Sequence, residues 1–364
     1  MRLFSTRFRR PVRGDEIKSQ STIFQQKEGG IHTYRIPALQ VLPDNVVLAF
    51  AEARKFSGSD FEKTALAMKR STDGGQSWGP LQILWDNGEA IQNPCPVYDA
   101  ITGELFLHTI VDRRDHYLQR SRDAGLTWSA PEHLQLRKSH WTCAGPCPAH
   151  AVQLASGRLL IPGMYNVGDA KSDKDWGSYF VKSDDHGQTW QLAHDFGEGT
   201  NEFTFAERAD HVLYSIFRPN QRIPSPFTRY SLSENGGDTW SPLTPHPDLG
   251  GTICEASLLQ LRYFPDPQIK PLLYAKPAHP DQRFQLTIKY SLDGGTRWQS
   301  LLTLTKGRSG YSDLAELPDG TVLCLIEQGR RVYREKLVLY RLHLHPVGDG
   351  LIGDFIAGRT SQDQ

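Results

Sequence analysis

Short apolar runs separated by polar turns dominate this chain, and helical periodicity is hard to find along it. Residues 66–70 form a strand-like run just before one polar turn, and residues 81–84 form another just after it. Short runs of this kind, bounded by turn residues, are typical of β-strands. The pattern therefore predicts an all-β protein.

The polar turn itself recurs five times as a box with the consensus Ser-x-Asp-x-Gly-x-Thr-Trp. The copies begin 50, 62, 50 and 58 residues apart and occupy residues 71–78, 121–128, 183–190, 233–240 and 291–298. Asp can accept hydrogen bonds from the backbone just ahead of it, and Gly adopts positive φ at little cost, so each box predicts a hairpin turn. Repeats of this length favour a six-bladed β-propeller with four antiparallel strands per blade, one blade lacking a box.

Composition narrows the class of partner. The 41 basic and 41 acidic side chains balance, which gives no reason to expect a nucleic acid partner. No run of 18 apolar residues exists, so we expect no transmembrane segment. We expect a basic, disordered tail over residues 1–20, one propeller domain over 21–345 and a C-terminal tail over 346–364. The arginines of the first tail leave peripheral contact with an anionic membrane open.

The five cysteines are scattered and odd in number, which does not resemble a disulfide framework. Cys143 and Cys147 lie close together, but no second cysteine or histidine pair follows them. The spacing therefore predicts no zinc site and fits a reducing compartment.

Three arginines stand in marked local contexts, each in a different interval between repeats. They are Arg35 in His-Thr-Tyr-Arg-Ile-Pro, Arg218 after an apolar run, and Arg283 before a strand-like run. Residues from different blades of a propeller can converge at its axis. Three guanidinium groups at one point would require a strong anion there.

Together with the five boxes, Tyr-Arg-Ile-Pro at residues 34–37 resembles the sialidase (neuraminidase) family. The resemblance covers roughly residues 25–340 and is greatest to animal sialidases of the lysosomal and cytosolic types. Four further segments share it, at residues 49–55, 93–99, 277–280 and 309–314. It implies a six-bladed propeller with the site on its axis, exo-α-sialidase activity on glycoproteins, gangliosides or oligosaccharides, and no metal or organic cofactor.

The resemblance also implies which residues bind substrate. The three arginines would form a triad on the carboxylate of sialic acid. Glu327 would orient Arg35, and Arg54 would be a further arginine near the carboxylate. Asn93 either contacts the N-acyl group or begins a turn before Pro94. Tyr165 and Met164 stand where members of the family line the glycerol-chain pocket.

The implied catalytic residues are Tyr311 as nucleophile, Glu202 as its base, and Asp60 as acid and base on a loop over residues 55–60. Sialic acid carries a carboxylate on the anomeric carbon, so a neutral phenol avoids the repulsion that a carboxylate nucleophile would meet. Tyrosine has a pKa near 10 and needs a neighbouring base, and sialidases are a known exception to paired carboxylates. The outcome would be retention of configuration.

Several alternatives remain at this stage. Glu62 and Asp44 compete with Asp60, Glu207 competes with Glu202, and the nucleophile could instead be a core tyrosine. The function could be that of a trans-sialidase, of a hydrolase preferring deaminated sialic acid, or of a sugar-binding propeller without catalysis. The N-terminus has no apolar signal core, so we expect a cytoplasmic protein, with lysosomal or membrane-peripheral locations as alternatives.

Overall fold

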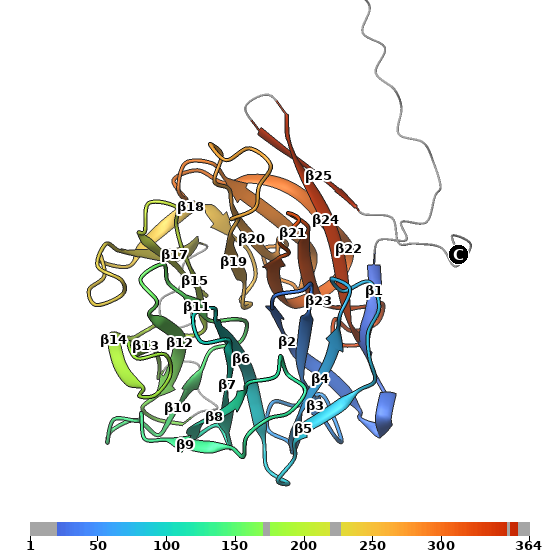
Figure 1. Cartoon of the computed structure of the whole chain (residues 1–364), viewed down its shortest axis with the longest axis vertical. Coiled ribbons are helices and arrows are strands. Elements are labelled where there is room, and N and C mark those ends of the chain that lie inside the picture. The colour runs from blue at the N-terminus through green and yellow to red at the C-terminus, as the bar shows by residue number, and fades with distance from the viewer. Residues whose placement is uncertain (1–19, 170–174, 219–226, 348–349, 356–364) are drawn as a thin grey trace, which may run out of the picture.

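The computed structural model describes residues 20–169, 175–218, 227–347 and 350–355. Strands joined by turns and loops make up these residues, and the helical element among them is one 3₁₀ turn, η1 (Glu28–Gly30). The sheets stand in a ring around a central axis (Figure 1), and neighbouring strands within them run antiparallel. The prediction of an all-β, propeller-like fold is confirmed. Among these residues no helix is long and apolar enough to cross a membrane.

Four sheets of the ring are separate blades. Blade 1 contains β2 (Thr33–Val41), β3 (Val47–Arg54), β4 (Thr64–Ser71) and β5 (Gln82–Trp85). Blade 2 contains β6 (Ile91–Asp99), β7 (Glu104–Val111), β8 (Asp115–Ser121) and β9 (Glu132–Leu134). Blade 3 contains β10 (Cys143–Pro146), β11 (Val152–Gln153), β12 (Leu159–Asn166), β13 (Trp176–Ser183) and β14 (Gln191–Glu198). Blade 4 contains β15 (Phe203–Glu207), β16 (Leu213–Phe217), β17 (Phe227–Ser233) and β18 (Thr244–Gly250).

The prediction of six four-stranded blades is wrong, because the rest of the ring is one continuous eight-stranded sheet. Its strands are β19 (Ser257–Gln260), β20 (Leu272–Pro277), β21 (Phe284–Ser291), β22 (Gln299–Glu316), β23 (Val322–Gly329), β24 (Lys336–Val347), β1 (Gln20–Gln25) and β25 (Gly350–Phe355). The physical reason lies in β22, which is 18 residues long. Its first part pairs with β21 and its second part with β23, so hydrogen bonding does not stop where a blade boundary was expected.

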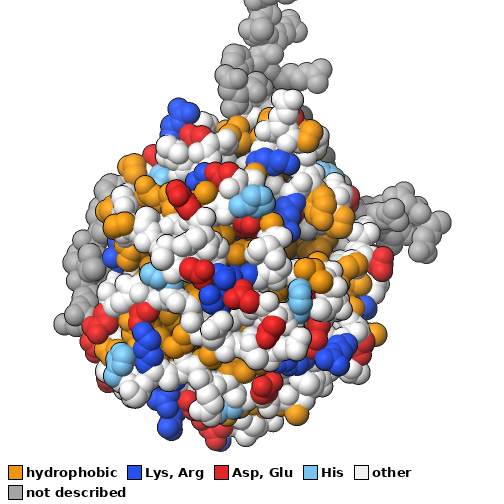
Figure 2. Space-filling view, turned by 60° about the vertical axis from the view of Figure 1, so that its left-hand side comes forward, with side chains coloured by type: hydrophobic (Ala, Val, Ile, Leu, Met, Phe, Trp, Pro, Cys, Tyr) orange, Lys and Arg blue, Asp and Glu red, His pale blue; other side chains and the backbone are white. Residues whose placement is uncertain are grey.

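The two ends of the described chain meet in this sheet, where β1 pairs with β24. The expected N-terminal tail lies almost wholly outside the described residues. The expected boundary at residue 345 falls inside β24, and β25 lies within the segment expected to be a C-terminal tail. The single domain over 21–345 stays a prediction. On the face shown in Figure 2, acidic and basic side chains are interspersed, as the balanced composition suggests.

The five boxes form turns between neighbouring strands, as predicted. In each box the first Ser accepts a hydrogen bond from the backbone N–H of the Gly at position five, as Ser71 Oγ does from Gly75 N at 2.9 Å. The box Asp accepts from the backbone of the residue four positions on. Asn235 replaces Asp in the fourth box, and its Oδ1 still accepts from Thr239 N at 2.9 Å. The replacement therefore preserves the turn.

The box tryptophans hold neighbouring sheets together. Trp128 of blade 2 meets Phe50 of blade 1 edge-on, with ring centroids 5.9 Å apart. Trp240 of blade 4 stacks on Phe180 of blade 3 at 5.0 Å. Burying these large rings between sheets stabilises the ring, and it makes the inner strands a rigid frame for any site on the axis.

Candidate active site

Three inner strands are irregular at the end where the predicted site residues gather. The register of β2 shifts between Arg35 and Ala38, that of β6 between Gln92 and Cys95, and that of β22 between Ser309 and Ser312. Bulges of this kind bend a strand and redirect its side chains, and they are common beside active sites. The bulges thus turn side chains from three strands toward one cavity.

Backbone strain accompanies these bulges. Ile36 has φ of 57° and Asn93 has φ of 53°. A β-branched residue is a genuine outlier at positive φ, at a cost of about 1–3 kcal/mol. At Gly310 an added Cβ would collide with Glu327 and Tyr333, so this position requires glycine. The surrounding contacts must hold this geometry in place.

Several of the contacts that hold this geometry are hydrogen bonds to Glu327. Its side chain is fully buried and accepts from Arg35 Nε at 2.8 Å and Arg35 Nη2 at 3.2 Å. It also accepts from the backbone N–H groups of Ile36 and Tyr311, each at 3.1 Å. One carboxylate on β23 therefore fixes Arg35 and Tyr311 relative to each other. The role predicted for Glu327 agrees with this geometry.

Tyr311 is hydrogen bonded as an activated phenol would be. Its hydroxyl donates to Glu202, with both carboxylate oxygens 2.7 Å away, and it accepts from Arg218 Nη1 at 2.9 Å. Arg218 also forms an ion pair with Glu202. Burial raises the pKa of the phenol well above 10; Arg218 opposes that rise and Glu202 adds to it. The hydroxyl is therefore neutral at rest, with a base in contact.

The other two arginines flank the same tyrosine. The Cζ atoms of Arg35 and Arg283 lie 5.3 and 5.1 Å from the centre of the Tyr311 ring. Both also lie over the ring of Tyr333, at 5.3 and 4.9 Å. With Arg218 at the hydroxyl, the three arginines predicted to converge do converge. They create a strongly cationic region around one phenol.

Asp60 lies at the edge of this region, on the loop between β3 and β4. Its carboxylate accepts from Arg35 Nη1 at 2.9 Å and pairs with Arg54 Nη1 at 2.5 Å. Arg54 is held in turn by Glu52, which lies two residues before it on β3. Burial alone would raise the pKa of Asp60, but Arg54 and Arg35 outweigh it and hold the pKa below its ordinary value. The side chain is 54% exposed, so it can reach a bound molecule.

These groups line a cavity of about 260 Å³. The predicted residues on its wall are Arg35, Arg54, Asp60, Asn93, Glu202, Arg218, Arg283 and Tyr311. Ile110, Cys143, Met164 and Trp176 form an apolar part of the wall. The cavity can therefore accept a molecule that is anionic at one end and apolar at another.

Tyr165, predicted to bind substrate, is not among the residues that line this cavity. Its ring stacks on Trp141 with centroids 4.0 Å apart, and its hydroxyl donates to Asp195 at 3.0 Å. Successive side chains of a strand point to opposite faces. Met164, its neighbour on β12, faces the cavity instead.

The structure places three of the residues that the sequence left as alternatives or with an open role. Glu62 accepts from the backbone of Phe56, outside the cavity lining. Glu207 lies five residues beyond Glu202 on β15, and it lines a different cavity. Asn93 does not begin a turn but lies in the bulge of β6, where its side-chain amide donates to Pro146 O at 3.0 Å.

The lining residues that sequence reasoning missed include Glu52, Arg113 and Tyr333. Glu52 could have been found, because residues i and i+2 of a strand share a face and Arg54 was already a candidate. Tyr333 follows two arginines in a loop and carries no periodic signal.

The five cysteines are buried and unpaired. Across the part of the chain that the structure describes, no three His, Cys, Asp or Glu side chains gather in a way that could hold a metal ion.

Replacing Glu327 with Ala should destabilise the fold strongly. The change leaves the Arg35 charge and two backbone N–H groups buried without their acceptor, a loss of about 3–5 kcal/mol. Urea unfolding at pH 7, followed by tryptophan fluorescence, measures it. The control is Glu132→Ala, because Glu132 is 56% exposed and pairs with Arg120 at 3.5 Å. That pair should contribute about 1 kcal/mol or less. Equal losses in the two variants would contradict the structural role of Glu327.

Comparison with known proteins shows which family this chain resembles in sequence and fold. The model of the BNR repeat-like domain matches residues 47–324. Sialidase-3 of Mus musculus is 30% identical over 87% of this chain and 92% of its own length. A sialidase of Micromonospora viridifaciens is 28% identical over 88% of this chain. The match covers about half, 53%, of that relative's own length. The solved structure of the Hadza microbial sialidase Hz136 shares the fold, with a TM-score of 0.78, 24% identity and coverage of 88% of this chain and 68% of its own. This chain belongs to the sialidase family of glycoside hydrolases.

Proposed function

We propose that this protein is an exo-α-sialidase that removes terminal α-linked sialic acids from glycoproteins, gangliosides or oligosaccharides with retention of configuration. The contact of the Tyr311 hydroxyl with both oxygens of Glu202 at 2.7 Å, beneath three arginines, carries this proposal. A phenol in contact with a base is poised to attack a carbon that already bears a carboxylate.

Binding begins with the substrate carboxylate, which Arg35, Arg218 and Arg283 would hold. In the free protein, Arg35 Nη1 donates to Asp60. The incoming carboxylate competes for that donor and releases Asp60 from one of its two cations. The pKa of Asp60 then rises toward its ordinary value, because an opposite charge favours the ionised form of a carboxyl group. Substrate binding itself therefore prepares Asp60 to carry a proton.

In the first chemical step, the Tyr311 oxygen forms a bond to the anomeric carbon as its proton passes to Glu202. The bond to the leaving oxygen breaks, and Asp60 donates its proton to that oxygen. Positive charge develops on the sugar ring, and the substrate carboxylate and the phenolic oxygen stabilise it.

In the second step, water attacks the anomeric carbon as Asp60 accepts one of its protons. The bond to Tyr311 breaks, and Glu202 returns a proton to the phenolic oxygen. Two displacements at one carbon restore its configuration. The apolar wall around Met164 and Trp176 accommodates the less polar substituents of the sugar.

Tyr311→Phe should lower kcat on a fluorogenic α-sialoside by about 10²- to 10⁴-fold, the usual size of a lost catalytic group. Tyr340→Phe is the matched control, since Tyr340 is also buried but belongs to the core of the eight-stranded sheet. It should retain wild-type kcat. Near-ultraviolet circular dichroism confirms that both variants fold. An unchanged rate in Tyr311→Phe would refute the role of Tyr311 as nucleophile.

The pH dependence of kcat/KM tests the role of Asp60. Arg54→Met removes one cation beside Asp60, so its pKa rises and the acid stays protonated to higher pH. The alkaline limb of the kcat/KM profile should therefore move to higher pH. Arg54→Lys keeps the charge and should leave the limb close to that of the wild type. A limb that stays in place in Arg54→Met would rule out Asp60 as the group that sets it.

A further inference from the structure

A second and larger cavity, of about 500 Å³, opens on the axis of the ring away from the candidate active site. It is formed by other residues of the same inner strands. On β2, Arg35 lines the candidate active-site cavity and Gln40 lines the second cavity. On β22, Tyr311 lines the candidate active-site cavity and Glu316 lines the second. Five residues of extended strand span about 16 Å. The two cavities are therefore separate sites at opposite ends of shared strands.

The wall of the second cavity is mainly apolar. Apolar side chains reach it from several sheets around the axis, namely Leu39, Val41, Val97, Phe205, Leu258 and Leu314. A concave apolar wall with a few polar groups is the usual form of a small-molecule site.

Most polar groups of the lining are already engaged. Glu316 accepts from the backbone N–H groups of Arg262 at 2.6 Å and Tyr263 at 3.0 Å. Glu207 accepts from Ala155 N at 2.7 Å and lies 3.1 Å from His211 Nδ1. Both carboxylates therefore have donors of this chain and do not require a cationic ligand.

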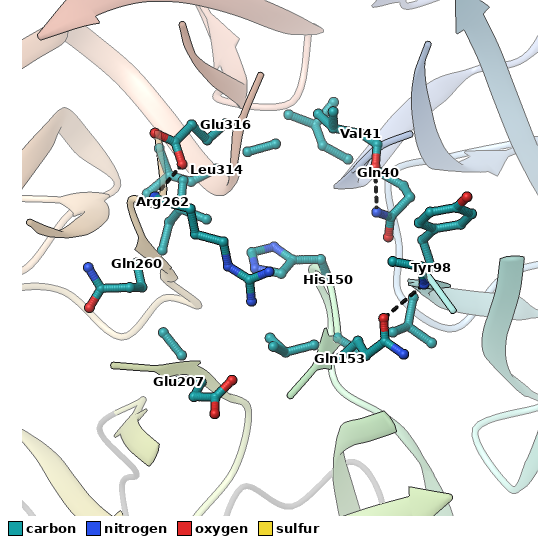
Figure 3. A pocket seen from close by; sticks show the side chains of 18 of the residues that line it. Gln40, Val41, Tyr98, His150, Gln153, Glu207, Gln260, Arg262, Leu314 and Glu316 are labelled. Atoms are coloured by element: carbon teal, nitrogen blue, oxygen red, sulfur yellow. Dashed lines mark hydrogen bonds between the residues drawn. The ribbon is translucent and has the colours of Figure 1, made fainter. Parts of the chain in front are cut away.

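Arg262 is the exception. Its guanidinium group points into the cavity (Figure 3), and within the described residues no hydrogen bond or ion pair engages it. His150 also points inward, from another side of the cavity. A guanidinium group over an apolar wall presents five donors to a planar anion.

His150 adds a second donor. Its Nδ1 lies 2.7 Å from Asp313 Oδ1, which leaves Nε2 for the cavity. Burial alone would lower the pKa of His150, but the Asp313 carboxylate raises it above its ordinary value. This shift favours the protonated ring, in which Nε2 carries a hydrogen. Asp313 itself is fixed by Ser257 Oγ at 2.9 Å and Leu39 N at 2.7 Å.

From this arrangement we infer that the second cavity is a binding site for a small organic acid, with one anionic group on Arg262 and His150 and an apolar body against the wall. Its ligand differs in kind from a sialic acid, because the wall offers few free polar groups for sugar hydroxyls. The site does not depend on the proposed catalytic function.

Fluorescence titration with 8-anilinonaphthalene-1-sulfonate tests this site, since that probe has an aromatic body and one sulfonate. We expect one saturable site on the wild-type protein. Arg262→Gln removes the charge and should weaken binding about ten-fold or more. Ala100→Trp places a bulky ring at the exposed edge of the cavity and should abolish saturable binding. Arg122→Gln is the control, because Arg122 is 81% exposed and lies elsewhere, and it should leave affinity unchanged.

Competition separates the second cavity from the active site. The sialidase inhibitor DANA should not displace the probe. Displacement by DANA, or the same affinity in wild type and Ala100→Trp, would overturn the proposal by locating the probe elsewhere. Unchanged affinity in Arg262→Gln would overturn the assignment of an anionic ligand. Thermal unfolding of each variant confirms that it is folded before titration.

Discussion

The candidate active site depends on one buried carboxylate, that of Glu327. Four donors meet it, two from the Arg35 side chain and two from the backbone at Ile36 and Tyr311. A charge this deeply buried is tolerable only when an opposite charge and hydrogen bonds surround it. In return, Glu327 fixes the distance between the first arginine of the triad and the phenol. The other arginines and Glu202 are arranged around that fixed pair.

The ring supplies the rigidity that such a site requires. Large aromatic side chains such as Trp128 and Trp240 join neighbouring sheets, so the inner strands cannot shift independently. The candidate site residues lie at and beside the places where these strands are irregular. Ile36 is held at positive φ, and Tyr311 lies within a bulge. Strained backbone of this kind persists only where the surrounding packed structure holds it in place.

Most of the candidate site residues were named through the resemblance of local motifs to a known family, and the structure brings most of them to one cavity. Boxes at regular intervals indicated repeated hairpins, and three arginines in different intervals could converge at an axis. Predictions failed where they depended on a side chain's direction or on strand length. The side chain of Tyr165 packs on Trp141 and does not line the cavity, and the unbroken length of β22 joined what had been counted as separate blades. Tyr333 lies in a loop, and no local sequence pattern predicts where that loop lies in the fold.

The most direct measurement is mass spectrometry of the protein after incubation with a 2,3-difluorinated sialic acid. Fluoride leaves readily from the anomeric carbon, and the second fluorine slows hydrolysis of the covalent product. If Tyr311 is the nucleophile held by Glu327 and activated by Glu202, one adduct per chain should form and digestion should locate it on Tyr311. An adduct on any other residue, or none in a protein that hydrolyses α-sialosides, would contradict the mechanism.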